Sequence, residues 1–141
     1  PATGQGRRRY PACAALGLSP AREPRFREQN FGAWTGRRHA DLEREAPEAY
    51  RVFWDAPASN KVAGGESFAE QIARVRDGLT AIDTPDAVLV VHSGTVRAAL
   101  AVALDLPPNR ALAFVVAPWS LTRLDRTGTG WRVECVNRNP R

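Results

Sequence analysis

The sequence predicts an α/β fold in which helices pack against a mostly parallel sheet. Residues 87–91 are five successive apolar residues, three of them valine, which is typical of a strand buried on both faces. An amphipathic helix is expected immediately before this run, over residues 67–82. Further strands are expected over residues 111–116, 120–126 and 131–136, and the last two flank a glycine-rich turn, which adds an antiparallel piece.

The composition is that of a soluble globular protein with one core. The chain has 141 residues, of which 43% are hydrophobic and 25% charged, so a single domain over residues 1–141 is expected. No apolar run approaches the roughly 20 residues that span a bilayer, so we expect no membrane partner. Cys13 and Cys135 lie far apart and only two histidines accompany them, so no metal or cofactor is expected, and reduced thiols predict a cytoplasmic location.

The basic residues indicate an anionic partner. The net charge is +5, and the excess is almost entirely arginine, whose planar fork suits phosphate and carboxylate groups. Residues 1–38 hold eight arginines against Glu23 and Glu28, so this end either binds an anion or forms a solvated face. Contact with nucleic acid or with a partner protein is the weaker alternative to a small phosphate ligand. Nucleic acid is disfavoured because the arginines are not interleaved with aromatic residues.

The N-terminal half is predicted to contain short elements. A helix is expected over residues 10–16, and two more over residues 39–46 and 47–54. The segment 31–36 mixes aromatic residues with glycines, which indicates backbone packed closely under large side chains. A long loop over residues 55–65 follows, and loops of this length are often functional.

The helix expected over residues 67–82 carries the clearest local signals. Ser67 and Glu70 form the Ser-x-x-Glu pattern of a capping box. Apolar residues then recur at steps of four and three, whereas Gln71 lies off that stripe. The apolar residues are Phe68, Ile72, Val75, Leu79 and Ile82.

The end of the apolar run at 87–91 is the first candidate site. His92 follows the run directly, Gly94 permits a tight turn, and Thr95 is a candidate cap for a helix over residues 96–104. Ligands of open α/β sheets bind at the carboxyl ends of strands, and helix N-termini favour anions. A histidine that merely ends a strand is the alternative, but the adjoining turn and helix start favour a site.

Four segments, in the same order, resemble motifs of the histidine phosphatase superfamily, the phosphoglycerate-mutase-like enzymes. They are residues 7–18, the run Phe-Arg-Glu-Gln-Asn-Phe-Gly-Ala-Trp-Thr-Gly at 26–36, Gly-Gly-Glu-Ser at 64–67 followed by Arg74, and His-Ser-Gly-Thr-Val-Arg at 92–97. The forms at 31–34 and 64–68 look most like α-ribazole phosphatases. The resemblance implies a three-layer sandwich, in which helices flank a mostly parallel sheet.

The resemblance also implies a phosphomonoesterase that acts on a small phosphate ester through a phosphohistidine. Glu28 would be the general acid, and His92 would donate to a phosphoryl oxygen. Arg8 would clamp the phosphate, with help from His92 and from amides near Ser93 and Gly94. Without the resemblance, Glu28 would be interpreted as one more charged loop residue.

Further residues receive roles from the same resemblance. Trp34 is expected in the wall of the substrate pocket. Glu66 either orients that pocket or merely precedes the helix cap. Arg7 or Arg9 would replace Arg8 as the phosphate clamp after a one-residue slip.

The sequence departs from the family at the nucleophile. The family's phosphorylated histidine lies in an Arg-His-Gly motif on its first strand, and this sequence contains none. His39 precedes an alanine and is interpreted as a surface residue. Since the chain begins with Pro1 and has no methionine, we expect an N-terminally incomplete domain with little turnover alone. The alternative is a non-catalytic phosphate-binding relative, and an exposed sheet edge would also allow a homodimer.

Overall fold

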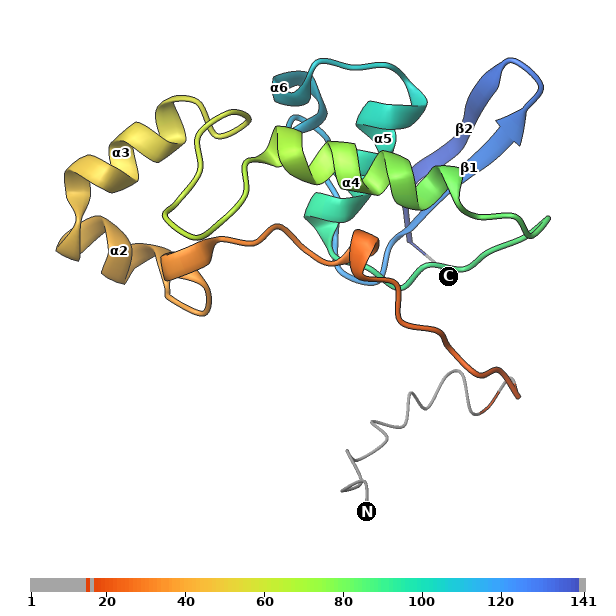
Figure 1. The fold of residues 1–141 in the computed structure, drawn as a ribbon, viewed down its shortest axis with the longest axis horizontal. Coiled ribbons are helices and arrows are strands. Elements are labelled where there is room, and N and C mark those ends of the chain that lie inside the picture. Colours follow the sequence, from red (N-terminus) through yellow and green to blue (C-terminus); the bar gives the residue numbers. More distant parts are fainter. Residues whose placement is uncertain (1–14, 16, 140–141) are drawn as a thin grey trace.

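The fold is organised around helix α4 (Phe68–Thr80), which lies across helix α5 (Ser93–Ala103) in this computed structural model (Figure 1). The structure describes residue 15 and residues 17–139. The candidate phosphate clamps Arg7, Arg8 and Arg9, together with Cys13 and nearly all of the helix expected over 10–16, lie outside the described residues.

The remaining elements surround this pair of helices. They are η1 (Pro24–Phe26), η2 (Gly32–Trp34), α2 (His39–Glu45), α3 (Pro47–Asp55), α6 (Pro108–Ala111), β1 (Leu121–Thr127) and β2 (Gly130–Arg138). Helices α2 and α3 stand at one end of the molecule and the β1–β2 hairpin at the other (Figure 1). The helices expected over 39–46, 47–54 and 67–82 are confirmed to within two residues. Within the described part of the chain, no helix combines the length and apolar character that crossing a membrane requires.

Helix α4 begins as its sequence predicts. The Ser67 hydroxyl accepts from the Glu70 N–H at 3.2 Å, and the Glu70 carboxylate accepts from the Ser67 N–H at 2.7 Å. The apolar face of α4 packs on the alanine-rich face of α5, whose small side chains allow close approach. The buried core consists of Phe26, Phe68, Ile72, Val75, Leu79, Ala98, Ala101 and Ala111.

Two glycine-containing loops, one around Gly32 and the other around Gly64 and Gly65, lie side by side. The Ala33 N–H donates to the Ala63 carbonyl at 3.1 Å, and the Glu66 N–H donates to the Asn30 carbonyl at 2.8 Å. Gly32 has a φ of +52°, and a methyl group there would overlap the backbone of Ala63. The close backbone packing predicted for residues 31–36 is therefore confirmed.

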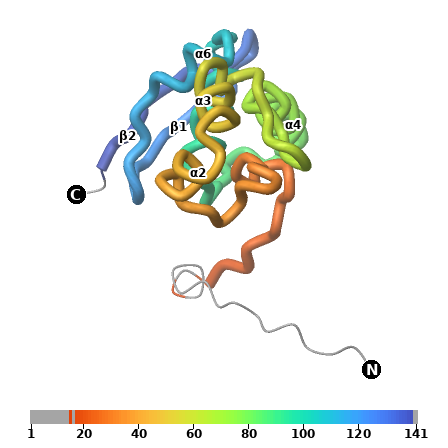
Figure 2. Tube along the Cα trace, turned by 90° about the vertical axis from the view of Figure 1, so that its left-hand side faces the viewer, coloured from red at the N-terminus to blue at the C-terminus, as the bar shows by residue number. Residues whose placement is uncertain are grey.

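The C-terminal strands form a two-stranded antiparallel sheet (Figure 2). Leu124 pairs with Val133 and Arg126 with Trp131. The Arg126 guanidinium also lies 5.1 Å from the centre of the Trp131 ring. The strands expected over residues 120–126 and 131–136 are confirmed: the first is shifted by one residue, and the second is longer than predicted at both ends.

The strand expected over residues 87–91 is absent from this structure, so that prediction was wrong as stated. Val88 and Val90 are 89% and 85% exposed instead of buried. The strand expected over 111–116 is also absent, and Val115 is 72% exposed. An extended segment becomes a strand only beside a hydrogen-bonded neighbour, and none of the described residues provides one here. The mostly parallel sheet is therefore not seen in residues 17–139.

Candidate active site

The carboxylate of Glu28 is held at the N-terminus of helix α5. Its Oε2 accepts from the Gly94 N–H at 3.1 Å, and its Oε1 accepts from the Gln29 N–H at 2.8 Å. Gln71 on α4 donates a third hydrogen bond, from Nε2 to Oε1 at 3.2 Å. The first turn of a helix has unpaired N–H groups and favours a negative charge. The fold thus places this carboxylate where α5 stabilises an anion.

A buried polar pair lies behind Glu28. Gln71 is fully buried, and its Nε2 also lies 3.3 Å from Thr95 Oγ1. The Thr95 hydroxyl lies 3.2 Å from the Phe26 carbonyl and 3.0 Å from the Arg27 carbonyl. Among the described residues, Gln71 Oε1 has no hydrogen-bond partner, which is costly in a core.

Sequence reasoning placed both residues of this pair wrongly. Gln71 lies three residues after Phe68 and four before Val75, so it shares their buried face rather than lying off it. That spacing was the available signal. Thr95 is not a helix cap, because α5 begins earlier, at Ser93, with His92 at the N-cap position.

Glu66 and Arg74 form a second buried unit beneath the loop of Glu28. Arg74 Nε and Nη2 donate to the two carboxylate oxygens at 2.9 and 2.7 Å, and the side chains are only 17% and 14% exposed for Arg74 and Glu66. Burial acts to raise the pKa of Glu66. The hydrogen bond from Arg74, the Asn30 N–H and the charge of Arg74 outweigh burial, so the pKa lies below its usual value. Through the hydrogen bond from the Asn30 N–H, Glu66 holds the loop that carries Glu28.

His92 and its neighbours lie at the same helix end. His92 is exposed, and its side chain makes no cap hydrogen bond. Ser93 Oγ accepts from Arg97 at 3.4 Å. The Gly94 N–H, expected to face a phosphate, donates to Glu28 in this structure. Glu28 and the segment 92–94 thus come together, whereas Arg8 lies outside the described residues.

A cavity of about 290 Å³ opens beside Glu28. Trp34 and Phe53 contribute to its wall, whereas Glu66 is not among the lining residues. His39 is exposed, as predicted, but it also lines this cavity. Within residues 17–139, no cluster of His, Cys, Asp and Glu side chains has the arrangement of a metal site.

Fold and site together define an α/β protein with an acidic side chain at a helix N-terminus, beside a cavity. Residues 9–139 match the sequence pattern of the histidine phosphatase superfamily (branch 1), and the chain belongs to this superfamily. The resemblance found in the motifs is therefore confirmed.

Two curated relatives show the level of similarity. A glucosyl-3-phosphoglycerate phosphatase of Mycobacterium tuberculosis is 34% identical over 117 residues, which cover 72% of this chain and 52% of that protein. A protein of Erwinia tasmaniensis named "Probable phosphoglycerate mutase" is 27% identical over 121 residues, which cover 83% of this chain and 56% of that protein. The chain thus spans about half the length of these relatives.

Solved structures show the same likeness. The mycobacterial glucosyl-3-phosphoglycerate phosphatase complexed with inorganic phosphate is 30% identical, with a TM-score of 0.73 over 90% of this chain and 69% of that chain. An α-ribazole phosphatase from Shigella flexneri has a TM-score of 0.78 at 21% identity over 89% of this chain and 64% of that chain, a likeness of fold alone. The chain therefore has the α/β fold of phosphoglycerate-mutase-like proteins.

Proposed function

We propose that this chain is part of a phosphomonoesterase of the histidine phosphatase type, which acts on a small phosphate ester. The observation that carries the proposal is Glu28, which lines a cavity and whose carboxylate accepts from the Gly94 N–H, two residues after His92. Departure of an alkoxide requires a proton donor close to the ester oxygen, and Glu28 is the acidic side chain that lines the cavity.

The residues divide the chemistry as follows. The phosphoryl group leaves the ester oxygen and bonds to a histidine nitrogen on a strand that this sequence does not include. Glu28 gives its proton to the departing alkoxide. His92, Ser93 and the amides at the start of α5, together with Arg8, stabilise the charge on the phosphoryl oxygens. Water then takes the phosphoryl group from the histidine, and the carboxylate of Glu28 receives the proton of that water.

The proposal also includes the mostly parallel sheet that the sequence predicts. In the complete protein, segments 87–91 and 111–116 become strands of a mostly parallel sheet. The apolar side chains of Val88, Val90 and Val115, now exposed, support this arrangement. A homodimer formed through these segments stays a prediction, and loss of dimer on dilution in light scattering would count against it.

Release of inorganic phosphate by the complete protein tests the proposal. Glu28→Gln keeps the side chain's shape but removes the proton donor, so kcat is expected to fall by about 10²–10⁴-fold. Glu43→Gln is the matched control, because Glu43 is an exposed carboxylate on α2 outside the cavity. Equal activity of the two variants, or full activity of His92→Ala, would refute the assignment.

The absence of Arg-His-Gly favours one alternative, a relative that binds phosphate without turnover. Calorimetry with inorganic phosphate, run beside the turnover assay on the same complete protein, separates the two. Binding that depends on His92 without any release of phosphate from esters would support the binder and exclude the enzyme.

A further inference from the structure

The cavity beside Glu28 has an aromatic wall. Phe31, Trp34, Phe53 and Trp54 all line it, together with Glu28. At about 290 Å³ the cavity is close to the lower limit for small-molecule sites, roughly 300 Å³. It is therefore large enough for a small organic group and too small for a macromolecular segment.

The aromatic wall is held in place by ring-on-ring packing. The rings of Trp34 and Phe53 lie 5.2 Å apart at 65°, and those of Phe53 and Trp54 lie 5.1 Å apart at 88°. Such edge-to-face contacts are favourable and fix ring orientation. Phe53 is buried, whereas Trp54 remains 44% exposed, so its ring surface is available to a ligand.

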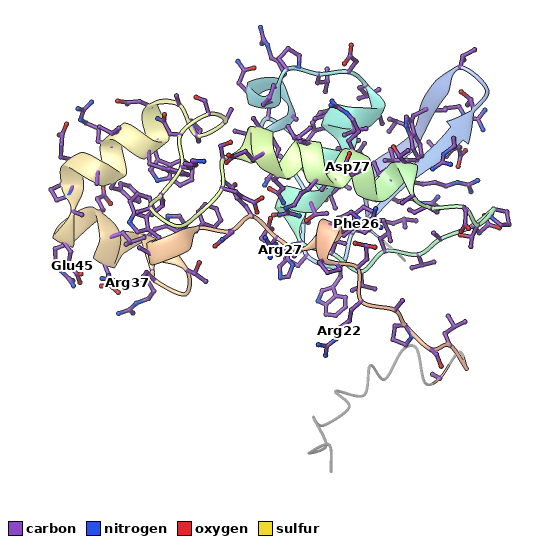
Figure 3. All side chains as sticks on the ribbon, in the orientation of Figure 1. Arg22, Phe26, Arg27, Arg37, Glu45 and Asp77 are labelled. Atoms are coloured by element: carbon purple, nitrogen blue, oxygen red, sulfur yellow. The ribbon has the colours of Figure 1, made fainter. Side chains whose placement is uncertain are left out.

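The two basic side chains that line the cavity, Arg37 and His39, already have partners within the chain. The Arg37 guanidinium is paired with Glu45, and the two side chains meet at the α2 end of the molecule (Figure 3). His39 Nδ1 lies 3.4 Å from the Tyr50 hydroxyl. An acidic group on the ligand would meet the Glu28 carboxylate, and Arg37 could bind it only by giving up its pairing with Glu45.

We propose that this cavity binds the alcohol part of the substrate, and that this alcohol carries a flat, uncharged ring. The inference rests on the proposed function, because the ester oxygen must lie against Glu28 to receive its proton. The carbon group attached to that oxygen then enters the adjoining cavity, where the rings of Trp34 and Trp54 stack on an apolar face. A small acidic alcohol such as glycerate is disfavoured by the same wall.

The test compares esters whose alcohols differ in the ring and the charge. The probes are 2-phenylethyl phosphate, ethyl phosphate and 3-phosphoglycerate, all alkyl esters, assayed with the complete protein. We expect the highest kcat/KM for the phenylethyl ester. In Trp54→Ala the ratio of kcat/KM for phenylethyl to ethyl phosphate should fall about tenfold, the value of one good aromatic contact.

Two further variants control for a general effect of losing a tryptophan. Trp119→Ala removes a side chain that is 90% exposed and outside the cavity, so it should leave the ratio unchanged. Trp54→Phe keeps a ring and should retain most of the preference. A wild-type preference for 3-phosphoglycerate, or the same ratio in Trp54→Ala and Trp119→Ala, would overturn the inference.

Binding of the alcohol alone separates this inference from the proposed function. With millimolar 2-phenylethanol and the 141-residue chain, the indole N–H signals of Trp34 and Trp54 should shift in NMR spectra, and that of Trp119 should not. Such binding without turnover of any ester by the complete protein supports the ring site and refutes the phosphatase. Turnover without any shift at Trp34 and Trp54 refutes the ring site alone.

Discussion

Arg74 is the side chain whose removal should cost the described fold most. It makes a bidentate pair with Glu66 and also donates to the backbone carbonyls of Arg25, Arg27 and Glu28 at 2.7, 2.9 and 3.1 Å. Arg74→Met keeps the length and packing of the stem but removes every one of these donors. It leaves a mostly buried carboxylate and three carbonyl groups without their partner.

The magnitude follows from burial. Breaking a buried ion pair by removing one partner costs about 3–5 kcal/mol, and the remaining exposure of this pair favours the lower end. We therefore expect the free energy of unfolding to fall by about 3 kcal/mol. For a chain of this length that corresponds to a drop in Tm of roughly 10 °C.

Urea and thermal unfolding of the 141-residue chain, followed by circular dichroism, measure this loss. Arg76→Met is the matched control, because Arg76 lies on the exposed side of the same helix and its side chain takes part in no ion pair of the described residues. In Glu66→Gln/Arg74→Met part of the loss should return, since the unpaired charge is gone. Equal stability of Arg74→Met and Arg76→Met would refute the reasoning.

Three other predictions concern the same region. The pKa of Glu66 lies below its ordinary value of 4.5, so the ionised Glu66 stabilises the fold fully above pH 4.5, and this stabilisation is lost as the pH falls through the lowered pKa. Urea unfolding midpoints measured from pH 6 to pH 3 should fall accordingly. Glu66→Gln should make these midpoints depend less on pH. A methyl at Gly94 would overlap the Glu28 carboxylate, so Gly94→Ala should lower activity of the complete protein at least about tenfold while stability changes by no more than about 1 kcal/mol. Gln71→Leu removes the buried amide that donates to Glu28 Oε1, so phosphate release by the complete protein should fall; activity equal to that of the unaltered protein would contradict this.

Local signals predicted the helices well because the physics that sets them is local. The Ser67–Glu70 capping box, the proline that opens α3 and the apolar spacing of α4 all act within a few residues of each other. The apolar run at 87–91 shows the opposite case. Its composition indicates a buried strand, but both burial and strand pairing depend on a neighbour elsewhere in the chain, and residues 17–139 contain none.

The candidate site was only partly accessible to the same reasoning. Glu28 has no local pattern that marks it as an acid, and only the resemblance of residues 26–36 to a family motif singled it out. Gln71 was missed because a glutamine beside Glu70 and Arg74 looks like part of a polar surface. Its partners, Glu28 and Thr95, lie 43 and 24 residues away in sequence, so no local pattern reveals the contact.

The contacts of helices α4 and α5 are sufficient to position Glu28. Gln71 and Arg74 are three residues apart and so lie on neighbouring parts of one helix face. Gln71 donates to the Glu28 carboxylate, and Arg74 donates to the Glu28 backbone carbonyl. The Gly94 amide of α5 holds the remaining carboxylate oxygen. Because all of these contacts lie within the described residues, the placement of the acid can be measured in this chain.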